Sequence, residues 1–202
     1  MRDPTARVHK SPTIPGVAPP ELSDGRVQVR ALGARDVEAY LAAFDEDADL
    51  LNLLGYEDAP KYEKLRRWFA EEWVEPPELR QWEFAVADRE TDAFLGTIMI
   101  HSCDWKNLRA EMGGWTVPNA RDQGVGSAAF RLLLDWAFDR VGLERIEITA
   151  LPENVSIPHL AGKFGFTYEG TLRKRNLERG RRVDLLIWGL LKGERAPAAP
   201  PR

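Results

Sequence analysis

The chain has 202 residues, of which 44% are hydrophobic and 30% charged, and its formal net charge is −4. These values are typical of one globular domain, and the overall acidity argues against a nucleic-acid-binding module. No apolar run approaches the roughly 18 residues that a membrane span needs. The polar, proline-rich N-terminus lacks the apolar centre of a secretory signal. We therefore expect a cytoplasmic protein with no membrane partner and no nucleic-acid partner.

Cysteine and histidine are scarce, with one cysteine, Cys103, and three histidines. A single cysteine cannot form an internal disulfide, which fits a reducing compartment. Cys103 follows an apolar strand-like segment, so we interpret it as a small packing residue rather than a nucleophile. With so few soft ligands, the sequence predicts no metal site.

Composition divides the chain into three parts. Residues 1–25 carry five prolines and little apolar bulk, and they are predicted to be a disordered arm. Residues 26–192 are predicted to form one folded domain, and residues 193–202 a second disordered tail. The charge is uneven, with 13 acidic against 4 basic residues in 36–78 and 8 basic against 3 acidic residues in 173–195. Two solvated faces would explain this asymmetry, and so would an acidic surface that attracts a cationic substrate.

Hydrophobic periodicity sets the order of elements within the domain. Helical spacing predicts helices at 36–44, 62–74, 124 to about 141, and 154–164, while alternation predicts strands at 27–30, 81–87, 94–102, 109–117 and 145–151. A last hairpin is expected from 166 to about 175 and from 182 to 191. The strand at 145–151 should run parallel to the strand at 109–117, because a helix connects them. The predicted fold class is α/β (α+β), a mixed sheet with helices on both faces.

The most informative stretch is RDQGVGS, residues 121–127, between a predicted strand and the long helix. Gly124 and Gly126 leave main-chain N–H groups approachable at the helix start, where the helix dipole favours an anion. The first turn of this helix carries no Asp or Glu that would occupy that place. A glycine-marked turn opening a core helix is the ordinary alternative to a phosphate seat.

Several segments, taken in order, resemble the GCN5-related N-acetyltransferase (GNAT) superfamily, and more narrowly its RimJ/RimL-like branch. They are EMGGW at 111–115, RxxGxG at 121–126, PENV at 152–155 before a helix ending KFGF, EG at 169–170, and Asp184 in the final strand. The resemblance covers roughly residues 26–192. It implies a mixed seven-stranded sheet with antiparallel N-terminal strands, splayed between strands 4 and 5, and about four helices on both faces. A dinucleotide-binding domain would instead place its glycine loop early in a series of βαβ units.

The resemblance also implies an activity, the transfer of an acetyl group from acetyl-CoA to a primary amine by direct attack in a ternary complex. The acceptor would be a peptide α-amine, an amino acid or a small amine, and acetyl-CoA would be a co-substrate. The Gly113–Gly114 pair suits a bulge beside the pantetheine, or equally two glycines packed beneath a tryptophan. A backbone N–H near Trp115, Thr116 or Val117 would stabilise the thioester oxyanion. The diphosphate would be held by Arg121 and the N–H groups of Gln123, Gly124, Val125, Gly126, Ser127 and Ala128, and the region near the pantetheine by Asn154.

Glu111 and Glu147 are the two candidate bases for the amine proton, with Glu111 favoured, and a solvated acid is the alternative for each. The position that aligns with the family's tyrosine acid is Ala161. Ser156 is a further catalytic candidate, although it stands one residue before the position where the branch places a serine. Without a clear acid, a catalytically degenerate acyl-CoA-binding sensor remains an alternative, as does transfer of a longer acyl group. The resemblance also allows a homodimer.

Overall fold

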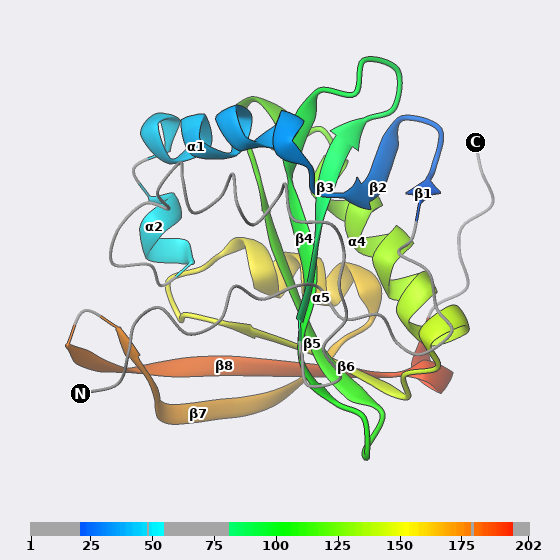
Figure 1. Cartoon of the computed structure of the whole chain (residues 1–202). Coiled ribbons are helices and arrows are strands. Elements are labelled where there is room, and N and C mark those ends of the chain that lie inside the picture. Colours follow the sequence, from blue (N-terminus) through cyan, green and yellow to red (C-terminus); the bar gives the residue numbers. More distant parts are fainter. Residues whose placement is uncertain (1–20, 48, 55–80, 179, 196–202) are drawn as a thin grey trace, which may run out of the picture.

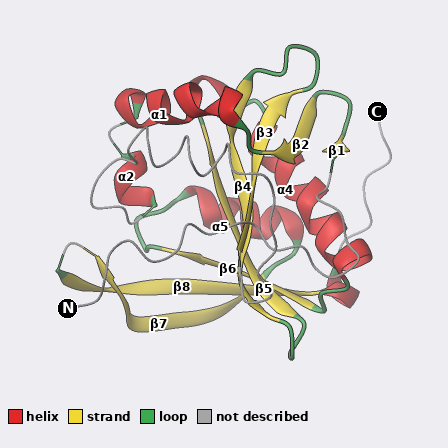
Figure 2. Cartoon of the chain, in the orientation of Figure 1, coloured by secondary structure: helices red, strands yellow, loops and turns green. Residues whose placement is uncertain are grey.

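The structure is a computed structural model that describes residues 21–47, 49–54, 81–178 and 180–195. Its centre is an eight-stranded mixed sheet in the order β1-β2-β3-β4-β5-β6-β8-β7 (Figures 1 and 2). The strands are β1 Leu22–Ser23, β2 Val27–Ala31, β3 Gln81–Asp88, β4 Phe94–Asp104, β5 Arg109–Thr116, β6 Arg145–Ala150, β7 Thr167–Glu178 and β8 Arg181–Leu191. The helices are α1 Val37–Glu46, α2 Leu50–Leu53, α4 Val125–Trp136 and α5 Ser156–Phe164.

The strands and helices predicted within the described residues are confirmed, with small differences at their ends. A π-helical turn, Ala137–Val141, continues α4, and Gly142 ends it with a φ of +82°. The sheet has eight strands rather than the predicted seven, because Leu22 and Ser23 pair antiparallel with β2. Two residues are too short to carry a periodic signal in the sequence. The predicted helix at 62–74 lies outside the described residues.

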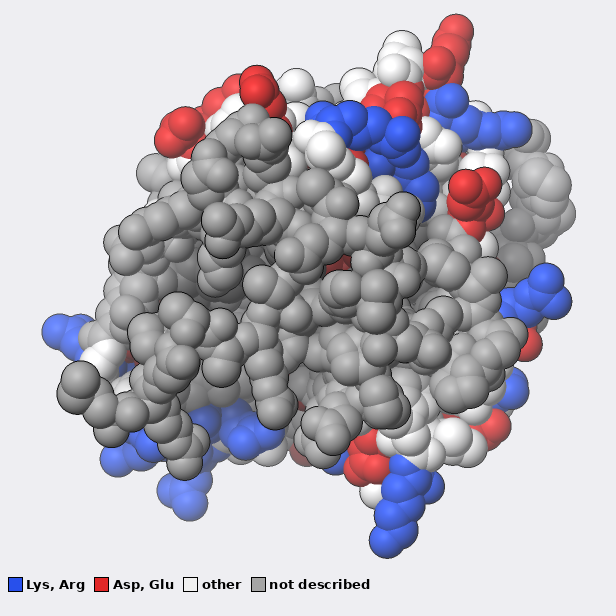
Figure 3. Space-filling model, viewed as in Figure 1, with Lys and Arg blue, Asp and Glu red and all other residues white. Residues whose placement is uncertain are grey.

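Two groups of like charge stand out among the side chains of the described residues. Figure 3 shows acidic side chains at the upper left, where α1 lies, and basic side chains at the lower left, at the end of the β7–β8 hairpin. The exposed basic residues of this hairpin are Arg173, Lys174, Arg175, Arg181 and Arg182. Within the described residues, the acidic side chains of α1 are thus separated in space from the basic side chains of the β7–β8 hairpin.

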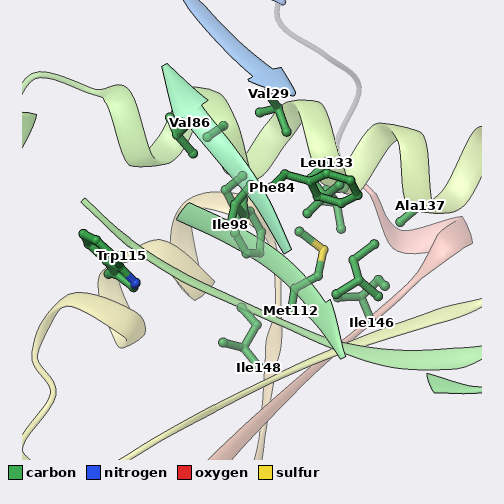
Figure 4. Close-up of a cluster of buried hydrophobic side chains, with 14 of the residues drawn as sticks. Val29, Phe84, Val86, Ile98, Met112, Trp115, Leu133, Ala137, Ile146 and Ile148 are labelled. Carbon is green, nitrogen blue, oxygen red and sulfur yellow. The ribbon is translucent and has the colours of Figure 1, made fainter. Parts of the chain in front are cut away.

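The hydrophobic core lies between α4 and one face of the sheet. Figure 4 shows Leu133 of α4 close to Phe84 and Met112, with Ile146 of β6 in the same cluster. The helix α1 covers the opposite face, where the rings of Tyr40 and Trp115 stand 5.2 Å apart. Since side chains alternate along a strand, the odd-numbered residues of β5 face the α1 side and the even-numbered ones face α4.

The glycines of β4 and β5 allow these two strands to approach unusually closely. A Cβ atom at Gly96 would lie 2.1 Å from the Trp115 carbonyl oxygen, and one at Gly114 would lie 2.5 Å from the Thr97 carbonyl oxygen. Of the two interpretations of Gly113–Gly114, the bulge is wrong, because the β4–β5 register runs unbroken past both glycines. The irregularity lies near the turn instead, between His101 and Asp104. Gly114 is thus needed for close backbone approach.

The sheet opens in its middle, between β5 and β6. These parallel strands pair only at three levels, and the last level joins Glu111 to Glu147. Beyond it β5 continues to Thr116 and β6 to Ala150, while β6 stays paired with β8 along its length. The splay expected between the fourth and fifth strands is confirmed. These strands are numbered β5 and β6 here because β1 is an additional first strand.

One buried acid in this fold has a measurable consequence for stability. The Glu83 side chain of β3 is 5% exposed, and the Tyr40 hydroxyl stands 3.4 Å from its Oε1. Burial raises the pKa of Glu83 from 4.5 to about 7, and the Tyr40 hydrogen bond opposes this shift. The folded chain therefore holds the proton more tightly than the unfolded chain. This contribution to the free energy of unfolding is complete below pH 4.5 and is lost as the pH rises through 7.

We expect the substitution Glu83→Gln to remove this pH dependence, because the amide keeps the shape without the ionisation. Relative to the wild type, its free energy of unfolding should rise by roughly 2 to 3 kcal/mol between pH 5 and pH 8.5. Urea unfolding at both pH values measures this, with Glu38→Gln on the exposed face of α1 as the control. Parallel pH profiles for the Glu83→Gln variant and the wild type would contradict the burial argument.

Candidate active site

The level at which β5 and β6 separate brings the two predicted catalytic carboxylates together. Glu111 and Glu147 are register partners there, and their strands diverge directly afterwards. Both side chains stand on the α1 side of the sheet, because Glu111 is odd-numbered on β5 and directly opposite residues of paired strands share a face. The two candidate bases therefore sit side by side at the closed end of the opening.

Glu147 is held by ion pairs. Its Oε2 accepts from Arg109 Nη1 at 3.1 Å, its Oε1 accepts from Arg145 Nε at 2.8 Å, and its side chain is 10% exposed. Arg145 also binds Glu169, so the network joins β5, β6 and β7. Both oxygens of Glu147 are thus engaged by guanidinium groups, and the arrangement is typical of a structural carboxylate.

Glu111 has a different environment. The Thr149 hydroxyl of β6 donates to its Oε2 at 3.2 Å, and no arginine pairs with it among the described residues. His101 of β4 is its direct cross-strand partner, and sequence reasoning missed this residue. Burial lowers the pKa of His101, and the Glu111 charge opposes that shift. Counting positions back from the predicted turn at Lys106–Asn107 would pair His101 with Met112, so it is the irregularity between His101 and Asp104 that places His101 opposite Glu111.

The backbone of β5 beyond this level faces the opening. The Val117 N–H donates to the Leu95 carbonyl at 3.0 Å, so it is directed toward β4 and away from the opening. Backbone groups alternate in direction along an antiparallel strand, which directs Trp115 toward β4 as well. The N–H groups of Thr116 and Gly114 then point toward β6, where no strand pairs with them. Of the three predicted oxyanion donors, this geometry retains Thr116, and it adds Gly114.

The glycine loop begins where this free edge ends. Gly124 adopts a φ of +80° before the first turn of α4, and no side chain caps the helix start. The Ala128 N–H is already used, because it donates to the Gly124 carbonyl at 2.9 Å. A Cβ atom at Gly126 would lie 3.6 Å from Thr116 Cγ2, which places the helix start directly beside the end of β5. The loop and the free strand edge therefore form one continuous surface.

Two arginines stand at this loop. Arg121 donates from Nε to the Thr116 carbonyl at 3.2 Å and forms an ion pair with Asp47 at the end of α1. Arg26, which the sequence did not single out, donates from Nη2 to Gln123 Oε1 at 2.8 Å and remains exposed. Arg26 precedes β2, nearly a hundred residues before the loop, so only the folded structure brings its charge there.

The start of α5 holds the remaining predicted residues. The Asn154 Oδ1 atom accepts from the Ser156 N–H at 3.1 Å and from the Ile157 N–H at 3.2 Å, and so caps the helix. Ser156 is exposed, and its hydroxyl makes no hydrogen bond within the described part of the chain. Ala161 is fully buried in the core. The cap engages only the carbonyl oxygen of the Asn154 carboxamide.

The single cysteine lies in the core of the described structure. Cys103 is 3% exposed, and burial raises the pKa of its thiol to about 12, which agrees with a packing role. Across the described ranges, no group of three His, Cys, Asp or Glu side chains could hold a metal ion. None of the described helices is long and apolar enough to cross a membrane.

We expect Asn154→Ala to lower the free energy of unfolding by about 1 kcal/mol, because the cap of α5 is lost. Asn154→Asp should remain near the wild type, since a carboxylate oxygen can accept the same two N–H groups. Urea unfolding separates these variants, with Ser156→Ala as the neighbouring control. Equal stabilities for the Ala and Asp variants would show that the cap contributes nothing.

The chain matches the family described as Acetyltransferase (GNAT) domain over residues 26–167. It is 27% identical over 176 residues to "Uncharacterized N-acetyltransferase YoaA" of Bacillus subtilis, covering 86% of this chain and 97% of YoaA. It is 33% identical over 102 residues to "Putative ribosomal N-acetyltransferase YdaF" of the same organism, covering 50% of this chain and 56% of YdaF. The second match agrees with the RimJ/RimL-like branch.

Solved structures share the fold. The spermidine N-acetyltransferase of Vibrio cholerae, in complex with CoA and spermine, superimposes with a TM-score of 0.71 at 19% identity, covering 85% of this chain and 98% of that one. The family match spans the free edge of β5, the glycine loop and the start of α5. The chain therefore belongs to the GNAT family of acetyltransferases, which use acetyl-CoA as the acyl donor.

Proposed function

We propose that this chain transfers the acetyl group of acetyl-CoA to a primary amine that attacks the thioester directly. The observation that carries the proposal is the unpaired edge of β5, which runs from the glycine loop to Glu111. Main-chain amides in the middle of a sheet need partners. The pantetheine arm of CoA has two amide groups, which can form hydrogen bonds with the main chain along this stretch of β5.

The diphosphate is assigned to the start of α4. The N–H groups of Val125, Gly126 and Ser127 have no side-chain cap and no acidic residue beside them in the first turn. The helix dipole favours an anion at this end. Arg121 adds positive charge from the end of β5, where Asp47 fixes its position. Arg26 adds a second positive charge through its contact with Gln123.

The thioester is assigned to the free edge near Gly114 and Thr116. An N–H of either residue would donate to the oxygen as negative charge develops on it. A fixed donor of this kind acts without reorganisation, which is why a backbone group serves well. The Asn154 amide nitrogen, which the helix cap leaves unused, is the proposed contact near the pantetheine.

The proton of the attacking amine is assigned to Glu111, directly or through an intervening group. An ammonium has no lone pair, so the amine must lose a proton before it attacks. Glu111 stands at the end of the opening with one hydrogen bond from Thr149, whereas Glu147 is saturated by two arginines. Ser156 is kept as a candidate donor to the departing thiolate, because it lies exposed at the start of α5.

The acceptor is proposed to approach from the α1 side of the sheet, which Glu111 faces. The exposed acidic residues of α1, among them Asp45 and Glu46, would attract a cationic amine. The name of the structural neighbour from Vibrio cholerae gives it a polyamine substrate, and that of YdaF indicates a ribosomal one. Both classes offer a primary amine, so a panel of polyamines, amino acids and peptides covers the proposal.

We expect Gly126→Leu to weaken CoA binding by at least about tenfold, or ~1.4 kcal/mol, because the side chain would cover the proposed diphosphate seat. The fold should tolerate the change, since a Cβ atom here meets only Thr116 Cγ2 at an ordinary contact distance. Isothermal titration calorimetry with CoA measures the Kd. Gly162→Leu on the open face of α5 is the matched control. An unchanged Kd in Gly126→Leu would remove the glycine loop from the proposal.

We expect Glu111→Gln to lower kcat by on the order of a hundredfold while the Kd for CoA stays constant, as loss of a general base requires. Glu147→Gln should instead lower the free energy of unfolding by roughly 1 to 3 kcal/mol with a smaller effect on kcat. Amine-dependent thiol release measures the first effect and urea unfolding the second. Full activity in Glu111→Gln would refute its role. A wild type that binds CoA but releases no thiol with any amine would favour the sensor alternative.

A further inference from the structure

His101 lies beside Glu111 at the level where the sheet opens. The two residues are directly opposite in the antiparallel β4–β5 ladder, so their side chains share the α1 face. The imidazole is half-buried rather than solvated. Its neighbour Glu111 also accepts a hydrogen bond from the Thr149 hydroxyl on the far side of the opening. The imidazole, the carboxylate and the hydroxyl thus form a row across β4, β5 and β6.

The imidazole of His101 lies over Gly113, and its Nε2 atom has no hydrogen-bond partner within the described residues. A Cβ atom at Gly113 would lie 3.6 Å from His101 Nε2, so the ring leans over the glycine, two residues past Glu111 along β5. The other nitrogen, Nδ1, is hydrogen-bonded to Ser102 Oγ at 3.1 Å. The irregularity after His101, with Ser102 at a φ of +52°, turns that hydroxyl toward the ring. One nitrogen is therefore hydrogen-bonded, and the other lies over Gly113, in the part of β5 that β6 does not pair with.

Burial and the neighbouring charges together set the protonation state of the His101 ring. Burial lowers the pKa of His101, and Glu111 on β5 opposes this effect. On β3 the nearby titratable group is Glu83, whose pKa burial raises to about 7. On β6 the next group is Glu147, whose charge the two arginines offset. A neutral imidazole next to a carboxylate at pH 7 is a competent proton acceptor.

We propose that His101 is the intervening group that takes the proton from the acceptor amine and that Glu111 stabilises the imidazolium formed. This inference rests on the proposed function. The ammonium gives one proton to His101 Nε2, and its nitrogen then forms a bond to the thioester carbon. The carbon–sulfur bond breaks, the nitrogen gives up its second proton, and the departing thiolate takes a proton to become CoA thiol. His101 releases its proton to solvent, so one proton leaves per turnover.

The first test is the pH dependence of kcat/KM with a lysine-like amine, whose own pKa of about 10 lies outside the range. The wild type should lose activity as the pH falls through the pKa of His101. His101→Gln should lower kcat/KM at pH 7 by on the order of a hundredfold and abolish this limb. Glu83→Gln, which removes the other group titrating near neutrality, should keep the limb. A limb that persists in His101→Gln and disappears in Glu83→Gln would overturn the assignment.

The second test distinguishes a proton-accepting role from a packing role. Added imidazole should restore amine-dependent thiol release to His101→Ala, as it can replace a proton acceptor but not a packing residue. Independently, NMR titration of the His101 ring should give a lower pKa in Glu111→Gln than in the wild type, because an opposing negative charge is gone. His101→Gln identifies the resonance among the three histidines.

Different results would refute the role of His101 and the proposed acetyltransferase function. If the wild type binds CoA and acetylates an amine while His101→Gln retains full kcat/KM, the role of His101 is refuted and the proposed function stands. An absence of imidazole rescue together with an unaltered ring pKa in Glu111→Gln would likewise refute the pairing. If the wild type itself neither binds CoA nor releases thiol, the proposed function is refuted.

Discussion

The arrangement of this protein depends on main-chain groups that stay unpaired in the middle of a sheet. Pairing between β5 and β6 stops at Glu111 and Glu147, although both strands continue. A buried N–H or carbonyl without a partner costs as much as a lost hydrogen bond, so an interior strand edge persists only where water or a ligand satisfies it. The opening leads from the start of α4 to a carboxylate, so the proposed acyl carrier would lie along the strand.

Different interactions hold the two ends of this opening. At the closed end, Glu147 with Arg109 and Arg145 links neighbouring strands on one face, while the apolar core beneath α4 joins them on the other. At the open end, Trp115 packs against Tyr40 of α1, which holds β5 to the first half of the sheet. β6 remains paired with β8 in the second half. Because each strand is fixed to its own half, separating them requires no strained segment.

The sequence predicted the elements well where a periodic pattern was long enough, as for the strand at 94–102 and the helix that Gly142 ends. It did not predict β1, since two residues carry no period, nor the close approach at Gly114, since glycine suits a bulge equally well. His101 and Arg26 were missed for another reason. His101 reaches the candidate site through its register with Glu111, and Arg26 through its contact with Gln123 in the distant glycine loop. Neither residue lies within the motifs of residues 111–126.

Glu111 and Glu147 show how the fold gives different surroundings to two identical side chains. They occupy the same level of adjacent strands, and in the sequence each looks like an acid on the polar side of a strand. The difference comes from their neighbours, because β6 also supplies Arg145 to Glu147, while β4 supplies His101 to Glu111. A carboxylate whose two oxygens both accept from guanidinium groups stabilises the junction between the strands. A carboxylate beside an imidazole at the closed end of the opening has no arginine partner within the described residues, so the identity of the cross-strand partner distinguishes the two environments.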